Sequence, residues 1–175
     1  MGTGSGIAAF LLASRGVDVV GVDARAEWEP FWAISLAESQ AAGRIALRRG
    51  DAREALGGPY DVVVSNPPFF PAGSGPFSPD PWKAAARTET TATLEDFVRS
   101  GLAALSPQGR LCLVIPIERE RAAIDAGLPA VPTRIVRVGA RRVLVELRHG
   151  GTPATIETID EAGARERWYG LATGG

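Results

Sequence analysis

The residues with the clearest potential for chemistry stand in succession as Asn66-Pro67-Pro68-Phe69. An asparagine side chain both donates and accepts hydrogen bonds. The carbonyls of a rigid Asn-Pro-Pro segment are acceptors that local folding leaves free. Together these groups can hold an amino group while Phe69 stacks on the planar group that carries it. The four residues are therefore candidate catalytic residues, and the alternative is an asparagine-proline turn that only ends a strand.

A glycine-rich segment, Gly2-Thr3-Gly4-Ser5-Gly6, is the candidate cofactor-binding loop. It leads into an apolar run over 7–15 that predicts a helix closed by Gly16. Such a turn lets the backbone approach a ligand closely, so Gly2, Thr3, Gly4 and Gly6 are candidate binding residues. The dinucleotide fingerprint needs its third glycine or alanine at position 7, where Ile7 stands, so NAD fits poorly. A flexible glycine-rich terminus is the alternative.

Two aspartates that follow predicted strands are further candidates for the cofactor site. Asp23 ends the apolar stretch Val17–Asp23, about twenty residues after the glycines, where a carboxylate can accept from both hydroxyls of a ribose. Asp51 follows a short strand predicted over 45–49. Either aspartate could instead cap the next helix, so this alternative stays open for both.

The carboxyl ends of parallel strands are expected to bring these residues together. Tyr60–Ser65 contains three consecutive valines, a pattern typical of a strand covered on both faces, and the prolines end it. Asn66 is then expected at the carboxyl edge of an α/β sheet, where such folds bind ligands. Further predicted helices cover 29–42, 52–56, 94–105 (capped by Thr91 or Thr93) and 116–126, and further strands cover 110–115, 133–138, 142–147 and 154–159. Turns or loops are predicted at 71–82, rich in proline, glycine and serine, and at 106–109.

The composition is that of a soluble globular protein. The 175 residues are 45% hydrophobic and carry a net charge of −1, which fits one domain over 1–175 and no strong overall attraction to nucleic acid. Cys112 and His149 are the only residues of their kinds, so no intrachain disulfide can form and no metal site is expected. Neither a transmembrane stretch nor a signal peptide is evident, and the expected location is cytoplasmic.

These motifs together resemble the class I S-adenosylmethionine-dependent methyltransferases. The G-x-G-x-G spacing resembles their cofactor loop, and Asn-Pro-Pro-Phe resembles the signature of members that methylate planar amino groups. With the segments Ala86-Arg87-Thr88-Glu89 and Arg142–Gly151, the chain is similar to the small-domain methyltransferase family. It is most like the branch that N6-methylates an adenine beside the anticodon of valine tRNA.

The resemblance implies a Rossmann-like α/β fold with a mostly parallel sheet and an antiparallel last strand. It implies S-adenosylmethionine as the cofactor, bound by the glycine loop, Asp23, Asp51 and Asn66, with Asp51 beside the adenine. It implies RNA, and specifically tRNA, as the partner. Family members begin with a strand that ends in an acid two residues before the first glycine. Here Met1 stands between those positions, so the first strand and the usual upstream segment are expected to be missing.

Under this interpretation Asn66 and the Pro67 carbonyl accept the two amino hydrogens of adenine N6, and Phe69 stacks on the base. Five arginines are available for phosphate contacts or equally form a solvated face: Arg134, Arg137, Arg141, Arg142 and Arg148. Three alternatives stay open. They are methylation of a protein glutamine, methylation of guanine N2 in ribosomal RNA, and an inactive domain that only binds RNA or a partner.

Overall fold

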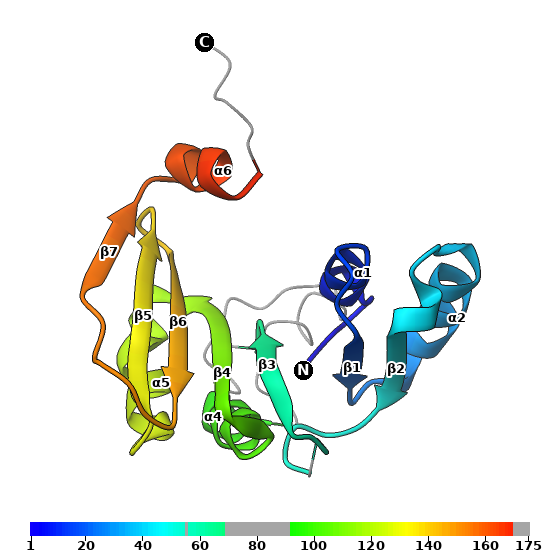
Figure 1. The fold of residues 1–175 in the computed structure, drawn as a ribbon, viewed down its shortest axis with the longest axis horizontal. Helices are drawn as coiled ribbons and strands as arrows, with labels where there is room; N and C mark the ends of the chain where they lie inside the picture. Colours follow the sequence, from blue (N-terminus) through cyan, green and yellow to red (C-terminus); the bar gives the residue numbers. More distant parts are fainter. Residues whose placement is uncertain (55, 69–91, 170–175) are drawn as a thin grey trace, which may run out of the picture.

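The strands of the computed structural model, which describes residues 1–54, 56–68 and 92–169, form two groups (Figure 1). The strands are β1 (Val19–Asp23), β2 (Ile45–Arg49), β3 (Tyr60–Ser65), β4 (Leu105–Pro116), β5 (Val131–Val138), β6 (Arg142–Arg148) and β7 (Ile156–Ile159). β1 and β2 pair in parallel, and the others form a sheet in the order β3-β4-β6-β5-β7. β3 is parallel to β4 and β7 to β5, whereas β6 is antiparallel to both neighbours. The fold is therefore α/β, mostly parallel, with one reversed strand.

Helices follow the strands in the order expected of a doubly wound fold. They are α1 (Ile7–Ala13), α2 (Glu29–Glu38), α4 (Leu94–Ala103), α5 (Glu120–Gly127) and α6 (Glu161–Tyr169), with short 3-10 helices at Ala26–Trp28, Ala42–Arg44 and Ile117–Arg119. α1 and α2 pack on β1 and β2, and α4 and α5 pack on the five-stranded sheet. α4 begins with a capping box: Thr93 Oγ1 accepts from the Asp96 N–H, and Asp96 Oδ2 accepts from the Thr93 N–H.

The main core lies between α4, α5 and one face of the five-stranded sheet. Side chains alternate along β4 and β6, so that one face of each strand is fully buried. Leu113 of β4 pairs with Val145 of β6, both are at most 1% exposed, and Leu94 and Val98 of α4 lie in the same cluster. This burial is the main source of stability for the strands that end at the candidate site.

β3 is buried on one face only, which corrects the expectation of a strand covered on both. Val63 is 7% exposed, but Val62 and Val64, which point the other way, are 41% and 38% exposed. Three consecutive valines cannot reveal this, because coverage of the second face depends on what else packs there.

As the resemblance implies, no described strand lies between β1 and β3. The segment Met1–Thr3 crosses between their carboxyl ends instead, and the N-terminus is marked there in Figure 1. The Met1 ammonium donates to the Val64 carbonyl at 3.0 Å, and the Met1 carbonyl accepts from Ser65 Oγ at 2.9 Å. The Thr3 N–H donates to the Val22 carbonyl of β1 at 3.0 Å.

Several element boundaries differ from those predicted. Residues 106–109 lie within β4 rather than in a turn, and the pairing of β3 with β4 shifts there. The helix predicted over 29–42 ends at Glu38, a turn replaces the helix expected after Asp51, and α6 was not predicted. The predicted loop 71–82, Thr91 and the Ala86–Glu89 motif lie outside the described residues.

The longest helices in the described part of the chain have ten residues, and none could cross a membrane. Within that same part, no group of three or more histidine, cysteine or acidic side chains is placed to hold a metal ion.

Candidate active site

The glycine loop is an ordered turn that joins the ends of β1 and β3. Gly2, Gly4 and Gly6 have φ values of 62°, 54° and 91°, in the left-handed region that other residues rarely adopt. At Gly2 a Cβ atom would also lie 3.1 Å from the ring of Phe97. The spacing G-x-G-x-G therefore meets a backbone requirement of this turn.

Asp23 fastens this loop to β1. Its Oδ2 accepts from the Gly4 N–H at 2.8 Å, and its Oδ1 accepts from the Arg25 N–H at 3.1 Å. The following 3-10 helix has Arg25 as its N-cap and no side-chain cap, so Asp23 does not play the capping role left open above. A carboxylate offers about four acceptor positions. Asp23 therefore has capacity for further donors, as a ribose would require.

Asp51 lies at the same sheet edge, because the neighbouring Gly50 N–H donates to the Asp23 carbonyl at 3.0 Å. Its two oxygens accept from Arg53 Nε at 2.9 Å and Nη2 at 2.6 Å, and Oδ1 also accepts from the Arg53 N–H. The hydrogen bond from the Arg53 side chain lowers the pKa of Asp51 below its ordinary value. Asp51 thus closes a local turn and stays ionised beside the loop.

Asn66 follows β3 at this edge and is exposed, whereas Ser65 before it and Pro67 after it are buried. Pro68 is half-buried, and Phe69 lies outside the described residues. Because Ser65 bonds Met1, whose neighbour is Gly2, the Asn66 end of β3 and the glycine loop are adjacent. The structure therefore brings together the glycine loop, Asp23, Asp51 and Asn66, while two buried neighbours fix the backbone on either side of Asn66.

The sequence interpretation missed Trp32. On the helix after Asp23, Phe31 and Ile34 are 51% and 61% exposed, whereas Trp32 is 4% exposed. The indole Nε1–H of Trp32 donates to the Gly4 carbonyl at 2.8 Å. The available signal was that a tryptophan near a binding loop needs an acceptor for its N–H when buried.

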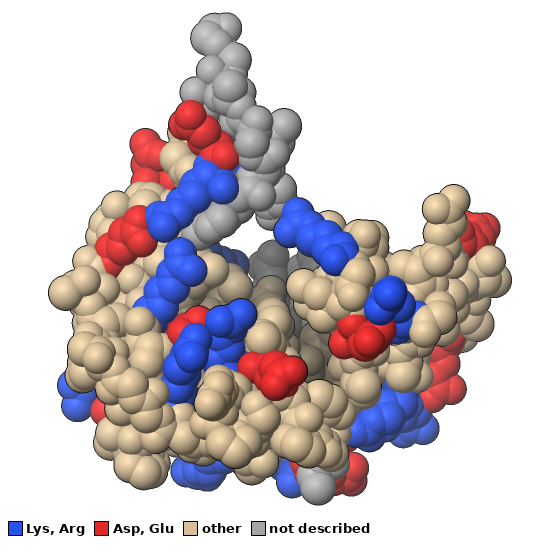
Figure 2. Space-filling model, in the orientation of Figure 1, with Lys and Arg blue, Asp and Glu red and all other residues tan. Residues whose placement is uncertain are grey.

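The five arginines proposed for phosphate contacts do not share one surface. Arg137 forms a two-fold ion pair with Glu120 of α5, at 2.8 and 2.9 Å. Arg148 bonds Glu146, which lies opposite Arg134 in the ladder between β5 and β6 and pairs with Cys112 of β4. Figure 2 shows acidic and basic side chains interspersed on the face in view. These side chains therefore do not form a single basic face.

Arg141 and Arg142 differ from the other three in position. They lie at the turn between β5 and β6, and Arg142 pairs with Pro116 at the carboxyl end of β4. Both are exposed. They are thus on the same edge of the molecule as Asn66.

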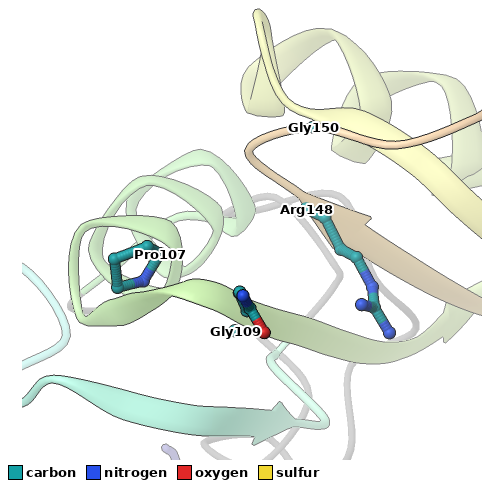
Figure 3. Close-up of a pocket in the computed structure, with 5 residues that line it drawn as sticks. Pro107, Gly109, Arg148 and Gly150 are labelled. Carbon is teal, nitrogen blue, oxygen red and sulfur yellow. The ribbon is translucent and has the colours of Figure 1, made fainter.

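Two hollows on the described surface lie away from the glycine loop and Asn66. One of about 260 Å³ is lined by Pro107, Gln108, Gly109, Arg148 and Gly150, at the amino end of β4 (Figure 3). Another of about 770 Å³ lies beside the amino ends of β1 and β2, between Gly16 and Gly43. Neither contains a candidate catalytic or cofactor-binding residue, because parallel strands place their amino ends at the opposite edge of the sheet.

Comparison with solved structures identifies the class of fold. The crystal structure of a predicted O-methyltransferase from Agrobacterium tumefaciens matches with a TM-score of 0.64 at 19% identity, covering 92% of this chain and 76% of that one. TrmN from Thermus thermophilus matches with a TM-score of 0.55 at 22% identity, covering 83% of this chain and 41% of that one. The glycopeptide N-methyltransferase MtfA complexed with S-adenosyl-L-methionine gives 0.55 at 15% identity, covering 86% and 80%. The chain has the Rossmann-like α/β fold of class I S-adenosylmethionine-dependent methyltransferases.

Comparison with curated proteins identifies the family. Three relatives share the name tRNA1(Val) (adenine(37)-N6)-methyltransferase. The one from Porphyromonas gingivalis is 36% identical over 148 residues, covering 78% of this chain and 54% of the relative. Those from Tolumonas auensis and Aeromonas hydrophila are 34% and 32% identical over 162 and 167 residues, covering 87% and 86% of this chain and 63% and 67% of the relatives. The chain belongs to this family. No protein-family model matches it, and it spans 50–54% of the length of the first relatives it matches.

Proposed function

We propose that this protein transfers a methyl group from S-adenosylmethionine to the exocyclic N6 amino group of an adenine in tRNA. One observation carries the proposal: the glycine loop and the Asn66 end of β3 are joined by the hydrogen bond from Ser65 Oγ to the Met1 carbonyl. A group bound by the loop would therefore lie beside Asn66. The names of the relatives, which are tRNA adenine-N6 methyltransferases, support the choice of substrate.

The residues present fit S-adenosylmethionine. The left-handed glycines expose backbone at the loop, Asp23 has acceptor capacity for ribose hydroxyls, and Asp51 stands at the end of β2 for the adenine side. When bound, the cofactor supplies an electrophilic methyl group on a positively charged sulfur. The chain itself supplies orientation and hydrogen-bond acceptors.

Asn66 would activate the adenine amino group. The nitrogen of this adenine amino group is a poor nucleophile because its lone pair is delocalised into the ring. The Asn66 side-chain oxygen and the Pro67 carbonyl would accept its two hydrogens and favour a more tetrahedral nitrogen, and Phe69 would stack on the base. After transfer of the methyl group, the amino nitrogen would release one proton to water. Burial of Pro67 keeps its carbonyl in a fixed place for this contact.

The RNA backbone would contact the β5–β6 turn. Arg141 and Arg142 are exposed and lie on the edge that carries Asn66. Replacing Arg141 and Arg142 together by glutamine should weaken tRNA binding. It should also lower the dependence of log affinity on log salt concentration by roughly 0.7–0.9 for each phosphate that the variant no longer neutralises. Arg44→Gln, directly before the amino end of β2 at the opposite edge, is the matched control and should leave this slope unchanged.

The first experiment is a calorimetric titration of the purified chain with S-adenosylmethionine, followed by methyl transfer to transcribed valine tRNA. Nucleoside chromatography of the product should show N6-methyladenosine. Asn66→Ala should abolish transfer and leave cofactor binding nearly intact, while Gln108→Ala, which removes an exposed amide at the opposite edge, should change neither.

Other outcomes would point to the alternatives. Methyl groups on N2 of guanine would identify guanine as the target. Methyl label that survives nuclease treatment but not protease treatment would identify a protein as the target. Cofactor binding with no transfer to any of these substrates would favour a domain that only binds RNA or a partner. Full activity of Asn66→Ala would refute the role given to that side chain.

A further inference from the structure

The peptide groups on either side of Gly4 are held by two different elements. The N–H of Gly4 is bound by Asp23 at the end of β1, and its carbonyl is bound by Trp32 of α2. Both hydrogen bonds are 2.8 Å long. The φ angle of Gly4 is 54°. Glycine adopts this left-handed conformation about as readily as others, so an unrestrained loop would sample several backbone conformations. The two bonds select one of them.

Trp32 is suited to this task because its indole is fixed. The side chain is 4% exposed and lies on a helix whose first turn contains Pro30, a residue with one allowed value of φ. The edge of the neighbouring Trp28 ring comes within 3.9 Å of the position that a Gly4 Cβ would occupy. A rigid donor aimed at a glycine carbonyl restricts the loop far more than a flexible side chain would.

We propose that Trp32 is a positioning residue that holds the glycine loop in its cofactor-binding conformation before the cofactor arrives. This proposal rests on the proposed function, because the loop is the site at which the cofactor would bind. Without the indole N–H, Trp32 cannot donate to the Gly4 carbonyl. The loop would then sample more backbone conformations. Cofactor binding must then order the loop as well, so affinity falls while the chemistry at Asn66 is unaffected.

The indole contributes both a hydrogen bond and packing, and the two can be separated. Site-specific incorporation of 3-benzothienylalanine at position 32 replaces the indole N–H by sulfur and keeps the shape of the ring. Trp32→Phe removes the N–H and part of the ring. Leu113→Val, which lies in the core between β4 and β6, is a control for destabilisation that does not touch the loop.

The measurements are the Kd for S-adenosylmethionine by calorimetry, KM and kcat for methyl transfer, and amide hydrogen exchange in the loop without ligand. With 3-benzothienylalanine, Kd and KM for the cofactor should rise about tenfold. At saturating cofactor, kcat should stay within about twofold of the wild type. Exchange at residues 3–6 should become faster, and Leu113→Val should show none of these changes.

An unchanged Kd and unchanged loop exchange in the 3-benzothienylalanine variant would overturn the proposal, even if Trp32→Phe bound poorly, because only packing would then matter. A fall in kcat with no change in KM would overturn it too. Failure of the wild type to bind S-adenosylmethionine would overturn the proposed function itself. Wild-type binding with an unaltered variant would overturn the role of Trp32 alone.

Discussion

Replacing Asp23 by asparagine removes one acceptor from the glycine loop with almost no change of shape. In the structure two backbone donors, Gly4 and Arg25, each have their own carboxylate oxygen, at 2.8 and 3.1 Å. Asparagine offers one oxygen and one NH2 group, so one N–H must face another donor. A hydrogen bond to a charged acceptor contributes about 1.5–3 kcal/mol. Because Asp23 is only half-buried, the lower value applies, and about 1.5 kcal/mol corresponds to roughly tenfold in an equilibrium constant.

Two assays check this figure. Urea unfolding should show a loss of about 1.5 kcal/mol in the free energy of unfolding, and the affinity for S-adenosylmethionine should fall at least tenfold. Asp18→Asn is the matched control, since Asp18 pairs with Arg44 at 2.8 Å in an exposed position where such pairs contribute about 0–1 kcal/mol. If Asp23→Asn behaved like Asp18→Asn in both assays, the loop would not depend on this carboxylate and the reasoning would fail.

Three further predictions concern the scaffold. Leu113→Ala removes about three carbons from the core and leaves a cavity, so it should cost about 3–5 kcal/mol in urea unfolding, while Leu128→Ala, at a position 67% exposed, should cost under about 0.5 kcal/mol. Thr93→Ala breaks the capping box of α4 and should cost about 1 kcal/mol, a loss that Thr93→Ser should largely avoid. Burial raises the pKa of Glu146, but hydrogen bonds from a threonine and an arginine outweigh it and lower the pKa below 4.5. Its contribution to stability is complete above pH 4.5 and lost as the pH falls through the lowered pKa, so Glu146→Gln should flatten the acid side of a plot of melting temperature against pH.

The features that the sequence predicted correctly depend on interactions between residues close together in the chain. Glycines at fixed spacing, a strand that ends on Asp23, and prolines that stop β3 after Ser65 each act within a few residues, so the edge that carries the site was foreseeable. The missed features depend on tertiary contacts. Trp32 reaches a loop far away in the chain, and the exposed face of β3 depends on what packs across it.

The charged residues illustrate the same limit. A run of arginines near the end of the chain cannot show where on the sheet each side chain lies. Arg137 faces Glu120 on α5 because strand alternation places it on the helix-covered side, whereas Arg141 and Arg142 lie at a turn. The strand register separates these positions, and register was not specified by the residue types alone.

The crossing of Met1–Thr3 between β1 and β3 has a consequence for folding cooperativity. No ladder joins the two groups of strands in the described chain, so the β1–β2 group and the five-stranded sheet are coupled through loop contacts and side chains. Units coupled in this way can open separately, and the β1–β2 group should exchange its amide hydrogens sooner than β4 and β6. A ligand that touches Asp23, the glycine loop and Asn66 at once would bind only when both groups are closed. Such a ligand would raise the free energy needed to open the β1–β2 group. The β1–β2 group and the five-stranded sheet would then unfold in one step instead of two.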